Sequence, residues 1–154
     1  MMRILYILSI AASILFAVLV LDYIVRVSEA RTEQLFEMMN SYGQDDPYSS
    51  SYSSYDDERD NRLTSEAGLM SLFFFVFYLA LQALTLVKLK TKTMKIITII
   101  GLSLTVIMAA WNGVMMSSPG GISFDEVGIV WLLYAVIMLT FGIIGTVHAF
   151  KRKA

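Results

Sequence analysis

The sequence contains no cysteine, a single histidine, His148, and only two prolines. Without cysteine there is no disulfide framework, no thiol redox exchange, no thiolate zinc site and no iron–sulfur cluster. A single histidine also excludes a haem held by two histidines and a metal centre built from several histidines. We therefore expect neither a cofactor nor a metal site.

Charge is scarce as well. Charged residues make up 16% of the 154-residue chain and hydrophobic residues 56%, whereas an ordinary soluble domain is about 25% charged and about 45–50% apolar. Twelve Lys and Arg stand against thirteen Asp and Glu, for a net charge of −1. Because no uncompensated basic face is available to neutralise phosphates, we expect no nucleic-acid partner. The composition indicates an integral membrane protein.

Four long stretches lack charge, and each has about the 20 residues that a helix needs to cross the hydrocarbon core. We predict membrane spans at residues 4–25, 67–87, 96–116 and 127–148. The third span should end near residue 116, because the Ser-Ser-Pro-Gly-Gly run that follows breaks a helix. Aliphatic runs of this length without alternating polarity favour helices over a barrel. The predicted fold is all-α, a multi-pass antiparallel four-helix transmembrane bundle.

Basic residues gather at one predicted end of this bundle. Residues 1–3, the hairpin 88–95 and the tail 149–154 carry eight Lys and Arg and no acidic residue, whereas every acidic residue falls on the opposite side. The positive-inside rule then makes both termini cytoplasmic. The hairpin lysines should lie at headgroup depth and attract anionic lipid at that face. We expect the protein in the plasma (inner) membrane.

Two segments on the outer side differ in character. Charged residues recur every three or four positions over residues 26–40, which predicts that the first helix continues outside the bilayer. Its apolar residues, Leu35 and Phe36 among them, either belong to a solvated helix end or dock on a partner or on the short outer loop, residues 117–126. Residues 41–66 are acidic and rich in Ser and Tyr, so we expect them to be disordered.

Few polar residues lie in or beside the spans. Asp22 and Arg26 are one turn apart at the end of the first span and suit an interfacial ion pair. Gln82 and Asn112 are lone amides, which usually form interhelical hydrogen bonds in membranes. A nucleophilic hydroxyl needs a base and an orienting partner, and His148 lies on the opposite side from every carboxylate. We therefore expect no enzyme.

Small residues recur at helical spacing, and such residues let membrane helices approach closely. Trp111, Trp131 and Tyr134 lie near the predicted outer boundary and Tyr6 near the inner one, and they suit an aromatic belt. The small-residue candidates for packing or interaction are Ser9, Ser13 and Ala17 in the first span, Ala109 and Gly113 in the third, and Gly142 and Gly145 in the fourth.

These observations favour a non-enzymatic accessory, scaffold or assembly subunit that acts through helix–helix and loop contacts. Its partner would be another membrane protein or a second copy of the chain. The alternative is a small oligomeric transporter or channel for a small solute or ion, using Asp22, Gln82 or Asn112. Transport requires these polar groups to converge on a water-filled path. A scaffold requires a dry bundle and an exposed apolar face.

Overall fold

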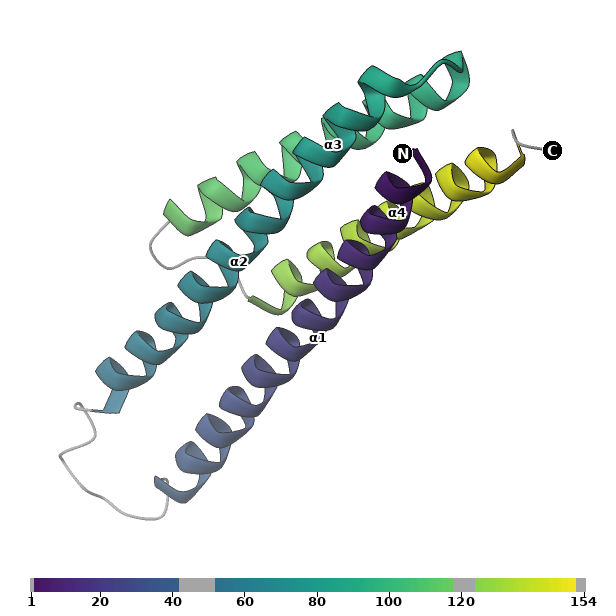
Figure 1. The fold of residues 1–154 in the computed structure, drawn as a ribbon. Coiled ribbons are helices and arrows are strands. Elements are labelled where there is room, and N and C mark those ends of the chain that lie inside the picture. The colour runs from purple at the N-terminus through teal and green to yellow at the C-terminus, as the bar shows by residue number, and fades with distance from the viewer. Residues whose placement is uncertain (1, 42–51, 118–123, 152–154) are drawn as a thin grey trace.

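The computed structural model describes residues 2–41, 52–117 and 124–151. The described residues form four α-helices, α1 (Met2–Ser41), α2 (Tyr52–Lys88), α3 (Lys92–Ser117) and α4 (Phe124–Lys151), which run alternately up and down (Figure 1). Each helix contains a segment long and apolar enough to cross a membrane. The predicted all-α, multi-pass, four-helix transmembrane bundle is confirmed.

Two helices are much longer than a bilayer requires. α1 has 40 residues, which corresponds to about 60 Å at 1.5 Å per residue, against a hydrocarbon core of about 30 Å. α1 runs without interruption through both the first predicted span and residues 26–40. In Figure 1, α1 and α2 project beyond α3 and α4 at one end, while both termini and the turn between α2 and α3 lie at the other.

The acidic segment differs from the sequence-based expectation. We expected an irregular stretch over residues 41–66, but α2 begins at Tyr52. A helix already formed in the membrane can extend into water without a new nucleation step, because each added residue contributes another backbone hydrogen bond. An ion pair between Arg62 Nε and Glu66 Oε1 at 3.2 Å, one turn apart, supports this extension. Residues 42–51, and residues 118–123 of the predicted second outer loop, lie outside the described residues.

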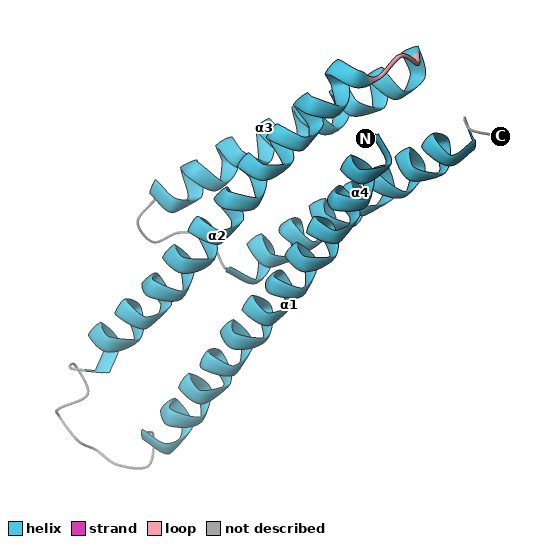
Figure 2. Ribbon diagram, viewed as in Figure 1, coloured by secondary structure: helices cyan, strands magenta, loops and turns pink. Residues whose placement is uncertain are grey.

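The helices associate as two antiparallel pairs. α1 packs most extensively with α4, and α2 with α3. Between the pairs, α1 and α2 make a larger contact than α3 and α4 do. A connection of only three residues, Leu89 to Thr91, joins α2 to α3 (Figure 2). Its backbone continues the helical hydrogen bonding, since Leu89 N donates to Thr85 O at 3.1 Å.

Buried positions recur at alternating intervals of three and four residues. This spacing is that of a left-handed supercoil, in which the side chains of one helix fit between those of its neighbours. The buried series in α3 is Met94, Thr98, Gly101, Thr105, Met108 and Asn112, and in α4 it is Gly128, Trp131, Ala135, Met138, Gly142 and Gly145.

An aromatic core fills the bundle from its centre toward the long ends of α1 and α2. The Tyr134 ring lies 5.3 Å from Phe75 and 5.9 Å from Tyr78, both in edge-to-face geometry, and Phe16 lies 5.8 Å from Phe75. Such aromatic pairs contribute about 0.5–1.5 kcal/mol beyond their buried area. Trp131 is 3% exposed, Tyr134 2% and Tyr6 7%, so their assignment to an aromatic belt is wrong. The belt prediction considered only depth in the membrane. Trp131 belongs to the buried series of α4, and Tyr134 lies beside its member Ala135, so both rings face the inside of the bundle.

Candidate functional site

A network of hydrogen bonds crosses the middle of the bundle and uses all four helices. The Tyr78 hydroxyl on α2 donates to Ser13 Oγ on α1 at 2.9 Å. On the other side of the aromatic core, Thr105 Oγ1 on α3 and the Tyr134 hydroxyl on α4 are 2.8 Å apart. Gln82 Oε1 on α2 lies 3.3 Å from Thr105 Oγ1. These bonds connect each helix to a neighbour near mid-membrane.

The hydroxyls in this network are satisfied locally. Ser13 Oγ donates to the Ser9 carbonyl at 2.8 Å and accepts from Tyr78. Thr105 Oγ1 donates to the Gly101 carbonyl at 2.8 Å, which leaves its oxygen able to accept from Tyr134. A buried polar group without a partner costs several kcal/mol in hydrocarbon. Because these groups have partners, the network can hold the bundle together without exposing a reactive hydroxyl.

The polar residues named from the sequence lie in three separate places. Asp22 pairs with Arg26 at 2.8 Å, and both side chains are more than half exposed. Asn112 is buried and donates from Nδ2 to the Gly68 carbonyl at 3.0 Å, which ties α3 to α2. Gln82 donates from Nε2 to the sulfur of Met138 at 3.1 Å. They do not converge on a common path.

The small residues of α4 lie where α1 approaches most closely. A Cβ added at Gly142 would lie 2.8 Å from Ile10 Cγ1, and one added at Gly145 would overlap the Tyr6 ring. On α1, Ser13 is buried and bonds to Tyr78 of α2, and Ser9 and Ala17 are half-buried. Gly142 and Gly145 therefore allow α1 and α4 to approach closely.

The two small residues of α3 differ from each other. Ala109 is half-buried and packs against the aromatic core. Gly113 is exposed, and a Cβ added there would meet nothing within 4 Å. Gly113 therefore does not mediate a close helix contact within the described chain, in contrast to the expectation from its spacing.

Sequence reasoning missed three network residues, Tyr78, Thr105 and Tyr134. Single hydroxyls in apolar helices are common and carry no signal of their own. The available signal was register, because Thr105 lies seven residues before the buried Asn112, and Tyr134 lies seven residues after the buried Val127. A heptad assignment would have placed all of them on inner faces.

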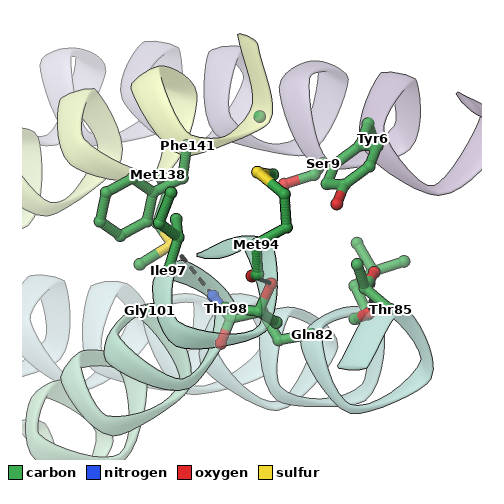
Figure 3. Close-up of a pocket in the computed structure, with 12 residues that line it drawn as sticks. Tyr6, Ser9, Gln82, Thr85, Met94, Ile97, Thr98, Gly101, Met138 and Phe141 are labelled. Atoms are coloured by element: carbon green, nitrogen blue, oxygen red, sulfur yellow. Dashed lines mark hydrogen bonds between the residues drawn. The ribbon is translucent and has the colours of Figure 1, made fainter. Parts of the chain in front are cut away.

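A small cavity lies between the two helix pairs at the basic end of the bundle. Its volume is about 40 Å³, which accommodates about two or three water molecules when one needs about 10–15 Å³. Pockets that bind organic ligands occupy about 300 Å³ or more. The polar residues in its lining are Tyr6, Ser9, Gln82, Thr85 and Thr98 (Figure 3).

The basic end itself is closed by contacts between distant parts of the chain. Thr91 Oγ1, in the turn between α2 and α3, lies 3.3 Å from His148 Nε2 on α4. The Arg3 guanidinium sits over the Phe150 ring at 4.1 Å from its centroid, a cation–π contact. In the described residues no group of three or more His, Asp or Glu side chains is arranged to hold a metal ion.

The extension of α1 carries an exposed apolar patch, which we call the arm patch: Leu35, Phe36 and Met39. Their exposed fractions are 60%, 68% and 77%. At about 1.5 Å per residue the patch lies roughly 20 Å or more along α1 beyond Asp22, whereas the headgroup layer adds only about 5–8 Å on each side of the core. The arm patch therefore faces water rather than lipid, in contrast to the exposed apolar residues of the spans.

Comparison with known proteins gives no relative, since no protein-family model, no curated protein and no solved structure matches the chain.

Proposed function

We propose that the protein is a non-enzymatic accessory or scaffold subunit of a membrane assembly. It sits in the plasma membrane with both termini cytoplasmic and holds another membrane protein through its outer helices. The observation that carries this proposal is the arm patch, an apolar surface on a helix that projects well beyond the bilayer. A water-exposed cluster of large apolar side chains is typical of a site for another protein.

The interior of the bundle supports the same proposal. Its centre is filled by the rings of Phe16, Phe75, Tyr78 and Tyr134, and the hydroxyls beside them bond to one another. A conduction path requires polar groups that converge on water across the whole membrane. The alternative, a transporter or channel, has less support because Asp22, Gln82 and Asn112 each have a different neighbour in a different place.

The opposite end of the molecule suits anchoring to anionic lipid. Arg3, Lys88, Lys90, Lys92, Lys95 and Lys151 lie at this end, together with His148. Each lysine or arginine near an anionic surface contributes about 1 kcal/mol. Such contacts would fix the depth of the bundle, so that the outer arm stands at a constant height above the membrane.

Copurification from the native membrane tests the proposal. The tagged chain is extracted in mild detergent, and associated polypeptides are identified and quantified for the wild type, Phe36→Glu and Ser28→Glu. Phe36→Glu places a charge in the arm patch and should reduce recovery of the associated chain at least tenfold. Ser28→Glu adds the same charge at an exposed position outside the patch and should leave recovery unchanged.

Two results would contradict the proposal. One is equal recovery of every associated chain with Phe36→Glu and with wild type at equal membrane abundance. The other is recovery of the tagged chain alone in all three samples. If the associated chain is an untagged copy of the same protein, the arm patch is a homo-oligomer interface and the heteromeric part of the proposal is wrong.

A further inference from the structure

The cavity at the basic end contains a buried hydroxyl that no other described residue satisfies. Tyr6 is 7% exposed and lines the cavity. Within the described part of the chain its hydroxyl oxygen has no hydrogen-bond partner. In Figure 3 this hydroxyl points from α1 toward the α2–α3 pair, on the side where Thr85 lies. The buried hydroxyls of Tyr78 and Tyr134 do have partners, whereas Trp131 Nε1, outside this cavity, is a second buried group without a partner among the described residues.

Groups on the opposite wall of the cavity can accept hydrogen bonds. Thr85 Oγ1 donates to the Leu81 carbonyl at 2.7 Å, and Thr98 Oγ1 donates to the Met94 carbonyl at 2.8 Å. Each of these hydroxyls has used its only proton, so its oxygen presents acceptor capacity to the cavity. A molecule between Tyr6 and the threonines would therefore have to accept at one side and donate at the other.

We propose that this cavity is a binding site for water, in which one to three molecules bridge Tyr6 on α1 to Thr85 on α2 and Thr98 on α3. The size and the lining both fit water. The cavity of about 40 Å³ is too small for a lipid headgroup or an organic solute, and among the described residues no charged side chain lines it, so an ion has no counter-charge there. Buried water typically makes about three hydrogen bonds to protein groups.

At this location, bound water would connect the two helix pairs. The cavity lies between the α1–α4 pair and the α2–α3 pair, which contact each other less than the helices within each pair. Toward the centre of the bundle, Tyr78 and Thr105 supply direct bonds from one pair to the other. At the cavity, Gln82 Nε2 donates to the Met138 sulfur across the same interface, and water would add the contact that Tyr6, Thr85 and Thr98 do not make with one another.

X-ray hydroxyl-radical footprinting of the detergent-solubilised protein detects the water directly. Radicals formed from bound water oxidise adjacent side chains, and methionine is highly reactive. Met94 and Met138 line the cavity, whereas Met108 is also buried but does not line it; Met108 and Met138 both belong to the aromatic core. We expect Met94 and Met138 to oxidise at least several times faster than Met108. Equal, slow oxidation of all three would mean a dry or lipid-filled cavity and would overturn the proposal.

A double-mutant cycle provides a second test, because its sign depends on the water. If water bridges Tyr6 and Thr98, Tyr6→Phe removes one of its bonds and should lower the Tm by about 2–4 °C. If the hydroxyl is simply unpartnered, its removal should leave the Tm unchanged or raise it. The double variant that combines Tyr6→Phe with Thr98→Val should lower the Tm by less than the sum of the two single decreases. A Tm that does not fall in Tyr6→Phe, or strict additivity, contradicts the bridge.

The control for Thr98→Val is Thr140→Val. Thr140 Oγ1 donates to the carbonyl four residues earlier at 2.9 Å, as Thr98 does, but Thr140 is exposed on the outside of α4. Replacing Thr140 by valine therefore measures only the loss of the hydrogen bond from the threonine hydroxyl to the backbone carbonyl of its own helix. Thr140→Val should be additive with Tyr6→Phe, and coupling of equal size in both cycles would remove the evidence for a shared molecule.

Discussion

Replacing Gly142 by alanine should destabilise the bundle, although alanine is the better helix former. A Cβ at this position would lie 2.8 Å from Ile10 Cγ1 and 3.7 Å from Ile10 Cα. Ile10 cannot easily turn away, since a β-branched side chain in a helix has one strongly preferred rotamer. α1 and α4 must therefore separate, and overpacking of this kind costs about 1–3 kcal/mol.

Gly113→Ala is the matched control for this substitution. It makes the same chemical change within a helix, but the added Cβ meets nothing within 4 Å. Gly113→Ala should be neutral or stabilising by up to about 1 kcal/mol, the difference in helix propensity. Since both variants share the propensity gain, the difference between their unfolding free energies isolates the packing strain at Gly142.

Reversible unfolding in mixed micelles, followed by circular dichroism, measures both variants. The expected order of stability is Gly113→Ala, then wild type, then Gly142→Ala, provided that the strain exceeds the propensity gain. The decisive quantity is the gap between the two variants, which should be about 1–3 kcal/mol. A gap within error of zero would refute the close α1–α4 approach.

Three further outcomes are expected. Tyr78→Phe removes the bond to Ser13 and should cost about 0.6 kcal/mol and no more than about 1.7 kcal/mol, measured in the same assay; a larger loss would mean that the network carries more than local contacts. Asp22→Asn breaks an exposed ion pair, so it should change stability by less than about 1 kcal/mol and leave any cellular phenotype intact; loss of activity at normal abundance and normal partner association would promote the transporter. An impermeant thiol reagent should label Ser28→Cys from outside intact cells and Lys90→Cys only after rupture; the reverse pattern would invert the orientation.

The sequence was sufficient to predict the class of the fold, and the reason is physical. Uninterrupted apolar runs of about 20 residues have few alternatives in a membrane, because their backbone groups must bond within the segment. The acidic stretch could not be judged in the same way. Its composition predicts disorder for an isolated segment, but residues 52–66 extend a helix that the membrane already nucleates.

The inner faces were harder to derive than the spans. By their position along the predicted span, Trp131 and Tyr134 lie near the outer boundary. Each residue is rotated by about 100° around the helix axis from the one before it, and this rotation decides whether a ring faces lipid or the core. Trp131 belongs to the heptad-spaced buried series of α4 and Tyr134 adjoins it at Ala135, so this error was avoidable. By contrast, the bond between Tyr134 and Thr105 depends on which helices are neighbours, and the sequence alone does not state that.

Photo-crosslinking at the arm patch tests the central claim, that the protein acts by holding a partner outside the bilayer. A photoreactive phenylalanine derivative replaces Phe36 in one sample and Ile107, which is 63% exposed on the membrane-spanning part of α3, in another. After irradiation of intact native membranes, the derivative at position 36 should give a discrete adduct with a second polypeptide. The derivative at position 107 should give lipid adducts. If Phe36 reacts with no polypeptide while the protein is at its normal abundance, the claim is contradicted.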